Sequence, residues 1–164
     1  MIHLSKLRAG SALALLSALM ICGCSGYRSP LIQLVSVTMT EESEEASVFT
    51  FELELQNPNS EPIELREFHY RLSLNGQEVY VGRRATGTTL HSDALQTIEL
   101  PAVVRYQLLG WTRSDRPQSL SYELRGTLLY VTPGELAEIL LDIGVRRPKV
   151  TFAKVGRLDL VQGQ

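Results

Sequence analysis

The chain has 164 residues, among them 12 glycines, 7 prolines, 2 cysteines and 3 histidines, a size that fits one domain. Its 16 basic and 18 acidic residues leave a formal net charge of −2, which argues against a nucleic-acid-binding protein that relies on a basic surface. With 44% hydrophobic and 21% charged residues, the composition is typical of a globular protein and excludes a disordered one.

The N-terminus has the pattern of a secretory signal. Lys6 and Arg8 are basic, no acidic residue accompanies them, and the run from Ala9 to Cys22 is apolar or small. This run is shorter than the roughly 20 apolar residues that a membrane-spanning helix needs. We therefore expect a signal helix that is removed, with an uncleaved N-terminal anchor helix as the alternative.

The end of the apolar run, Ile21-Cys22-Gly23-Cys24, resembles the lipobox of bacterial lipoproteins, whose last cysteine becomes the acylated N-terminus. Cys22 departs from the alanine, serine or threonine that is more usual at its place. The resemblance implies a signal peptide over residues 1–23 and a lipidated linker over residues 24–30. Cys24 would then carry acyl chains such as palmitate and hold the protein on a membrane.

Cys22 is the alternative acceptor, but Met20-Ile21 before it lacks the small residue that a signal peptidase needs. Ser25 follows the preferred acceptor, where an aspartate would indicate retention in the inner membrane. The resemblance therefore implies a cell-envelope protein, lipid-anchored in the outer membrane and facing the periplasm. Cleavage would leave one cysteine, so no disulfide could form within the chain. It would also change the net charge from −2 to −4, so attachment would depend on the acyl chains.

The first part of the mature chain is predicted to form two strands. Leu31 to Thr40 is the first, with Val35, Val37 and Met39 on one face. A run of glutamates after it predicts a solvated acidic turn. The second strand has the clearest alternation in the chain, in which four apolar side chains point one way and polar ones the other: Phe49, Phe51, Leu53, Leu55 against Thr50, Glu52, Glu54, Gln56.

Two turns with distinct chemistry follow. The first contains Asn57, Pro58, Asn59 and Pro62, which we interpret as turn-forming residues because Asx side chains bond their own backbone and proline fixes φ. A strand from Ile63 to Leu74 comes next, and a slip in its alternation predicts a bulge near Arg66-Glu67. Asn75-Gly76 predicts a two-residue type I′ hairpin turn, after which Val79 and Val81 lie on the returning strand.

The rest of the chain is predicted to contain further strands and one or two short helices. Gly82 to Asp93 is polar and loop-like, Leu95 to Val104 and Leu120 to Val131 are strands, and Pro101 marks an edge or a break. A short helix followed by a polar turn is expected within residues 105–118, where Trp111 is expected to pack in the core or at the sandwich end. A capping box at Thr132 to Glu135 predicts a helix ending at Gly144, with apolar residues at helical spacing: Leu136, Ile139, Leu140 and Ile143. Residues 149–153 and 156–161 are expected to form a final strand or hairpin.

About seven short strands separated by turns predict an all-β fold, a two-sheet β-sandwich. The domain is expected over residues 31–160, with a tail at 161–164. Four segments resemble the WHy (water stress and hypersensitive response) domain of the late embryogenesis abundant type 2 family: residues 51–65, 70–76, 122–126 and 151–158. The resemblance implies an immunoglobulin- or fibronectin-III-like sandwich with a non-enzymatic role in desiccation or related stress. The helix-like segment 133–144 departs from the family pattern.

Residues for catalysis or metal binding are sparse. His69 and His91 have no second histidine, cysteine or acid at ligand spacing, so we expect no metal site. His91-Ser92-Asp93 has the residue types of a hydrolase triad, but sequence neighbours rarely adopt that geometry, and we interpret it as a loop. Glu52 and Glu54 share one face of a strand and are interpreted as solubilising. We expect no cofactor, no nucleic acid and no small-molecule substrate.

Two functions of different classes remain. The first is protective, chaperone-like contact with client proteins that lose water. The second is an accessory lipoprotein that docks on an envelope protein complex through a sheet edge. An enzyme is the weakest alternative, and it would require a pocket that brings His69 or His91 near an acid.

Overall fold

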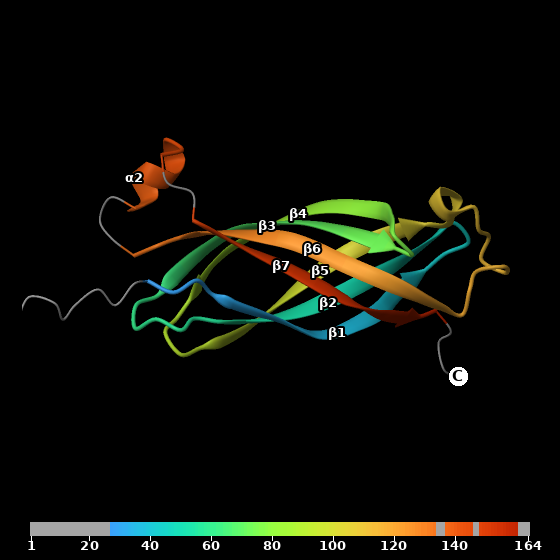
Figure 1. Cartoon of the computed structure of the whole chain (residues 1–164), viewed down its shortest axis with the longest axis horizontal. Helices are drawn as coiled ribbons and strands as arrows, with labels where there is room; N and C mark the ends of the chain where they lie inside the picture. The colour runs from blue at the N-terminus through green and yellow to red at the C-terminus, as the bar shows by residue number, and fades with distance from the viewer. Residues whose placement is uncertain (1–26, 134–136, 146–147, 161–164) are drawn as a thin grey trace, which may run out of the picture.

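The computed structural model describes residues 27–133, 137–145 and 148–160, which form seven strands in two antiparallel sheets (Figure 1). One sheet has the order β1-β2-β5 and the other the order β4-β3-β6-β7. The elements are β1 (Leu31–Glu42), β2 (Ala46–Gln56), β3 (Ile63–Leu74), β4 (Gln77–Leu90), β5 (Leu95–Arg105), the 3-10 helix η2 (Tyr106–Leu109), β6 (Ser119–Val131), α2 (Ala137–Asp142) and β7 (Lys149–Asp159). The predicted two-sheet β-sandwich is confirmed.

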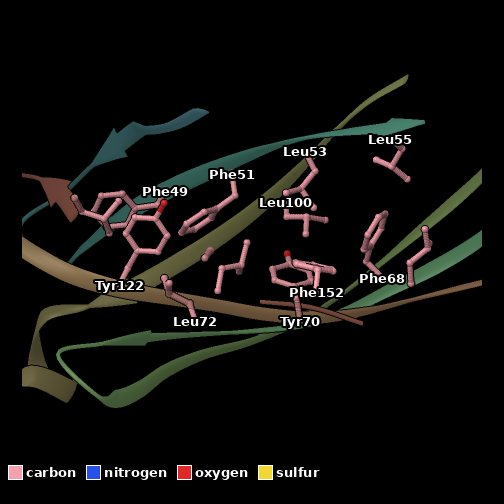
Figure 2. Close-up of a cluster of buried hydrophobic side chains, with 14 of the residues drawn as sticks. Phe49, Phe51, Leu53, Leu55, Phe68, Tyr70, Leu72, Leu100, Tyr122 and Phe152 are labelled. Atoms are coloured by element: carbon pink, nitrogen blue, oxygen red, sulfur yellow. The ribbon is translucent and has the colours of Figure 1, made fainter. Parts of the chain in front are cut away.

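The core lies between the two sheets and is built on the strand with the strongest alternation. Every second residue of β2 is buried, and Phe51, Leu53 and Leu55 are completely inaccessible to solvent. From the other sheet, β3 and β6 contribute Phe68, Tyr70 and other side chains to the same layer, as Figure 2 shows. Alternation of this kind buries one face of an antiparallel sheet and leaves the other to water, as predicted.

Three glycines make room for aromatic rings on the core side of the four-stranded sheet. Tyr70 lies directly opposite both Gly82 and Gly126, and Phe152 also lies opposite Gly126. A Cβ added at Gly126 would be 2.4 Å from Cζ of Phe152. The same relation holds for Gly156 and Tyr122. These glycines are therefore required by the rings that lie over them, which is the usual reason for glycine inside a strand.

Tyr70 also connects the two sheets by a hydrogen bond. Its hydroxyl donates to the carbonyl oxygen of Pro101 on β5 at 2.6 Å. Burial, with a smaller contribution from Tyr80, raises the pKa of the Tyr70 hydroxyl. Pro101 lies in an edge strand whose pairing with β2 is unbroken, so of the two predicted meanings of this proline the edge is the correct one.

The structure confirms the predicted bulge in β3 and the predicted hairpin turn, but it differs from the prediction for β1. The register of β3 shifts between Leu65 and Glu67 against both neighbouring strands, as predicted. Asn75 and Gly76 have φ angles of 48° and 84°, both positive as a type I′ turn requires. Val35, however, does not share a face with Val37, because a register shift between Leu34 and Ser36 leaves Val35 57% exposed.

One predicted loop is wrong. Residues 82–90 are not a loop, because β4 continues to Leu90 and pairs with β3 along its length. The side chains there are mostly exposed polar groups on an edge strand, so they show no hydrophobic period. Of the two alternatives predicted for residues 149–161, a strand or a hairpin, the structure shows the strand: β7 runs through residues 149–159, and Gly156 lies inside it.

The helices are short. The expected helix after β5 is the single turn η2, and Trp111 beyond it packs partly buried against the core. The helix predicted to end at Gly144 is α2, and Gly144 has a left-handed φ of 76°. Its buried side chain is Leu141, whereas Ile139 and Ile143 of the predicted apolar face are exposed. Part of the predicted capping box lies outside the described residues. Among the described residues, no helix is long and apolar enough to span a membrane.

Candidate functional site

The first predicted turn is organised around a buried amide. Asn57 follows β2 directly and is completely inaccessible to solvent. Its Nδ2 donates to the carbonyl oxygens of Glu61 at 2.8 Å and Leu90 at 3.1 Å, and its Oδ1 accepts from N and Nδ2 of Asn59, both at 3.0 Å. All four hydrogen-bonding positions of the amide are therefore used. Asn57 thus joins the end of β2 to the end of β4, across the two sheets.

Asn59 holds the chain where it enters the domain. Its Oδ1 accepts from the backbone N–H of Arg28 at 2.8 Å, and its Nδ2 donates to the Arg28 carbonyl oxygen at 2.7 Å. The side-chain amide therefore pairs with a backbone residue in the way that a neighbouring strand would. The structure assigns both asparagines a structural role, which agrees with their interpretation as turn chemistry.

Aromatic packing fixes the same entry segment. The ring of Tyr27 stacks on the ring of Tyr130 at the end of β6, with 6.1 Å between the centroids and 27° between the planes. The hydroxyls of Ser29 and Tyr130 are 3.1 Å apart. Burial, followed by the nearby Tyr130, raises the pKa of the Tyr27 hydroxyl. We call Tyr27, Arg28, Asn57, Asn59 and Tyr130 the entry clamp. Cys24, the predicted acylation site, lies outside the described residues.

The entry clamp was not predictable as a unit from the sequence. The Asn-Pro-Asn segment is typical of a turn, but Arg28, which pairs with Asn59, is 31 residues away from it and belongs to no sequence pattern. Tyr27 and Tyr130 are 103 positions apart in the sequence and meet only because β1 begins where β6 ends. Pro58 is half-buried and Pro62 exposed, so both prolines shape the turn without lining a site.

The opposite end of the sandwich is held by other contacts. Asn75 of the hairpin accepts at Oδ1 from N of Ser121 at 3.2 Å and from its hydroxyl at 2.9 Å. Arg116 contacts the carboxylate of Glu42 and donates to the hydroxyl of Tyr106 at 3.1 Å and to the carbonyl oxygen of Leu160 at 2.9 Å. Both charged side chains are about 15% exposed, so this ion pair is largely shielded from water.

One histidine does lie beside an acid. Nε2 of His69 is 2.5 Å from Oε1 of Glu67, and Nη2 of Arg83 is 3.0 Å from the same oxygen. The hydrogen bond from His69 is the largest reason that the pKa of Glu67 lies below its ordinary value, and Arg83 adds to it. These groups border a shallow groove on the outer face of the four-stranded sheet, which His69 and Arg83 line. Within the described residues, no hydroxyl or thiol hydrogen-bonds to His69, so the pair has no activated nucleophile.

The remaining candidates stay apart. His91 is exposed in the connection between β4 and β5, and its carbonyl oxygen accepts from N of Ala94, which makes the His91-Ser92-Asp93 segment a turn. Glu52 is hydrogen-bonded by the hydroxyl of Ser36 on the outer face of its sheet. No group of three or more histidine, cysteine, aspartate or glutamate side chains with the geometry of a metal site occurs in the part of the chain that the structure describes.

These features define a class of protein: a small β-sandwich whose polar clusters tie strands together. The family of late embryogenesis abundant proteins matches residues 52–143 of the sequence. This match covers more than half of the chain, which therefore belongs to that family. The resemblance to the late embryogenesis abundant type 2 family is confirmed, and the family supports, in general terms, a stress-related role without catalysis.

Solved structures share the fold. AT1g01470 from Arabidopsis thaliana superposes with a TM-score of 0.58 at 16% identity, and the match covers 81% of this chain and 83% of that one. At2g46140.1, a candidate late embryogenesis abundant protein, superposes with a TM-score of 0.62 at 14% identity, over 96% of this chain and 94% of its own. At these identities the likeness concerns the fold alone. Comparison with curated proteins by sequence gives no match.

Proposed function

We propose that this protein is a lipid-anchored, non-catalytic component of the cell envelope that protects other proteins when water is lost. The observation that carries the proposal is membership of the late embryogenesis abundant family by a chain whose described polar clusters are structural. The lipobox-like Ile21-Cys22-Gly23-Cys24 supports acylation of Cys24 and a place in the outer membrane, facing the periplasm. The entry clamp supports it too, because it gives a tether a fixed point of attachment.

The protective mechanism is contact between an apolar surface of the sandwich and partly unfolded clients. Drying weakens the solvation of a client and exposes its core, and a folded surface that occupies the exposed apolar groups prevents clients from aggregating. Exposed aliphatic side chains are available for such contact on several strands, among them Val35, Val81 and Val155.

Drying a sensitive model enzyme in the presence of vesicles tests this role. The lipidated full chain is reconstituted in the vesicles, and empty vesicles and vesicles with an unrelated lipoprotein serve as controls. We expect the enzyme to retain more activity after rehydration with this protein than with either control. Equal loss in all three samples contradicts the protective role. Mass spectrometry of the mature N-terminus tests the anchor separately, since acyl chains on Cys24 would add their mass to residues 24–164.

A second function, docking on an envelope complex through a sheet edge, is favoured by β7. This strand pairs with β6 over eleven residues without a register shift, and among the described residues no strand lies on its other side within its sheet. The other edges are less suitable: β1 and β4 have register shifts, and β5 contains Pro101 and packs beside β4. A long regular edge is a template for an added strand. Lys149, Lys154 and Arg157 along β7 would favour an acidic partner segment.

Photo-crosslinking in cells distinguishes the second function from the first. A crosslinking amino acid replaces Val155 on β7, which is 75% exposed, and in a matched variant it replaces Val81 on β4, which is 63% exposed. Docking predicts one stoichiometric partner captured from position 155 and not from position 81. Capture of many proteins from both positions would instead support client binding, and capture of none from position 155 contradicts docking.

A further inference from the structure

Exposed apolar side chains concentrate at the end of the sandwich where the chain enters. Leu31 begins β1 and Leu95 begins β5, and both lie opposite Gln56 at the end of β2. Three exposed side chains of α2 and its C-terminal turn lie at the same end, where α2 contacts β6 of the other sheet. We call these five side chains at one end the apolar rim, with exposed fractions of 51–72%: Leu31, Leu95, Ile139, Ile143 and Val145. The rim holds five of the ten large hydrophobic side chains that are exposed among the described residues.

The position of α2 explains why Ile139 and Ile143 stay uncovered. Leu141 is buried and holds the helix against β6, near Leu129. Ile139 of α2 and Ile143 in the turn after it are four residues apart, and the N–H of Ile143 donates to the carbonyl oxygen of Ile139 at 3.1 Å. They therefore lie on one side of this segment, and both are exposed. In Figure 1, α2, the start of β1 and the connection from β4 to β5 all lie at one end of the molecule, and β7 ends at the other.

The opposite end has a different surface. The connection between β1 and β2 and the segment after η2 are rich in charged side chains, including Glu42, Glu44, Arg113 and Arg116, which form ion pairs. Leu108 is the large exposed hydrophobic residue of η2 there. Because charged groups are costly to remove from water, that end is suited to solvent, whereas the apolar rim is suited to a surface that excludes water.

The short segment between Cys24 and Tyr27 indicates which surface the apolar rim faces. Tyr27 is packed on Tyr130, and Cys24 precedes it by three residues. A fully extended chain spans at most about 3.6 Å per residue, so an acylated Cys24 would lie within roughly 11 Å of Tyr27. Acyl chains in the bilayer therefore could not hold the domain clear of the headgroups. The entry end, and the apolar rim with it, would be brought to the lipid surface.

We propose that the apolar rim docks on the membrane, inserting Ile139, Ile143 and Val145 of the α2 segment, with Leu31 and Leu95, into the interfacial region of the bilayer. This inference rests on the proposed acylation of Cys24. Docking would fix the orientation of the sandwich, with the long axis of the strands rising from the membrane and the charged end facing the aqueous space. Amphipathic contact and acyl insertion would then act as two anchoring signals.

Fluorescence of a single introduced thiol tests the docking. The mature chain has one cysteine, the acylated one, so Val145→Cys and Val155→Cys each create a unique site for an environment-sensitive dye. The two valines are a matched pair, with exposed fractions of 72% and 75%, one in the rim and one on the middle part of β7. Each lipidated full-length variant is reconstituted in vesicles of phosphatidylethanolamine and phosphatidylglycerol, with and without lipids that carry a quencher in the acyl chain.

We expect a blue shift, a several-fold rise in emission and quenching at position 145, and none of these at position 155. Flotation of the vesicles and mass spectrometry of the N-terminus are measured on the same samples. A protein that is acylated and floats, but whose dye behaves alike at both positions, overturns the docking and leaves the anchor standing. A protein without acyl chains overturns both. A blue shift at position 145 without quenching, together with a dimer of the protein in the vesicles, would assign the rim to a second copy and would also overturn the proposal.

A variant that keeps the dye site tests the role of the neighbouring side chains. Ile139→Ser and Ile143→Ser together, in the Val145→Cys background, replace exposed side chains, so the fold is expected to persist, and unchanged thermal unfolding verifies this. We expect the blue shift and the quenching to fall to the level of position 155, while flotation continues through the acyl chains. Undiminished quenching in this variant contradicts insertion of the α2 segment.

Discussion

The two ends of the sandwich are stabilised by different kinds of contact. At the entry end, the neutral amides of Asn57 and Asn59 join backbone groups of segments far apart in the sequence. At the other end, an ion pair of Arg116 and Glu42 holds the segment after η2 against β1. Neutral hydrogen bonds carry no net charge for salt to screen, and an ion pair that is largely shielded from water is screened much less than an exposed one. The stability of each end should therefore depend on its own shielded contacts, which are neutral amides at the entry end and a charged pair at the other.

Replacing the buried amide gives the largest expected effect. Asn57→Ala leaves the carbonyl oxygens of Glu61 and Leu90 without their donor in a site from which water is excluded. We expect the free energy of unfolding to fall by about 3 kcal/mol, since each buried group left unpaired costs about 1–3 kcal/mol. Denaturant titration measures it. A loss as small as that of an exposed-residue control, Ser60→Ala, would contradict the importance of this amide.

Breaking the ion pair at the charged end gives the next largest effect. Arg116→Ala removes contacts to Glu42, Tyr106 and the carbonyl oxygen of Leu160. We expect a loss of about 2 kcal/mol, the range for hydrogen bonds to charged groups. Arg113→Ala is the matched control, because Arg113 is 47% exposed and its pairs with Glu42 and Glu44 should contribute little. A loss for Arg116→Ala no larger than that for Arg113→Ala would contradict the importance of the shielded ion pair.

Asn59→Ala should have a smaller and more local effect. It removes both hydrogen bonds to the backbone of Arg28 while Asn57 keeps its bonds to Glu61 and Leu90. We expect about 1 kcal/mol of global stability to be lost. Hydrogen exchange should show faster exchange of the Arg28 amide and unchanged exchange in β6, which distinguishes release of the entry segment from general destabilisation.

A change of pH should lower the stability of the entry end at alkaline pH and that of the opposite end at acidic pH. The folded pKa of Tyr27 is raised by burial above the unfolded value of about 10, so its contribution to stability is complete below about pH 10 and is lost as the pH rises further. The pKa of Asp115 is lowered by its hydrogen bonds from the side chain and backbone of Thr112, so its contribution is present above about pH 4 and is lost below. Residue-resolved NMR should show the Tyr27 signals broadening first at high pH and the Thr112 signals at low pH. Tyr27→Phe should remove the former response and leave the latter unchanged.

Much of the fold was predictable because its signals are local. The alternation from Phe49 to Leu55, the phase slip near Glu67 and the Asn75-Gly76 turn each depend on neighbouring residues, and each is confirmed. The extent of β4 was not predictable, since the core position at Gly82 is filled by the ring of Tyr70 from another strand, and no apolar side chain marks the strand there.

The contacts of the entry clamp and the apolar rim could not be predicted, because both depend on tertiary arrangement. The helical spacing of Ile139 and Ile143 predicts an apolar face, but both side chains are exposed, and Leu141 is the one that is buried. Short helices have few contacts to fix their rotation, so the neighbouring strand decides it. The bulge that exposes Val35 is likewise set by pairing with β2 rather than by the residues of β1.

The glycines opposite aromatic rings have a consequence for how the strands find their alignment during folding. A register shift of one residue would turn every side chain of the strand to the wrong face of the sheet. A shift of two residues keeps each side chain on its face, so the hydrophobic pattern does not oppose such a shift. If β4 moved by two, Tyr70 would meet Tyr80 or Arg84 in place of Gly82, where only a missing side chain leaves room for the ring. Each ring fits only opposite its glycine, so these pairs favour a single register of β4 against β3, and of β7 against β6.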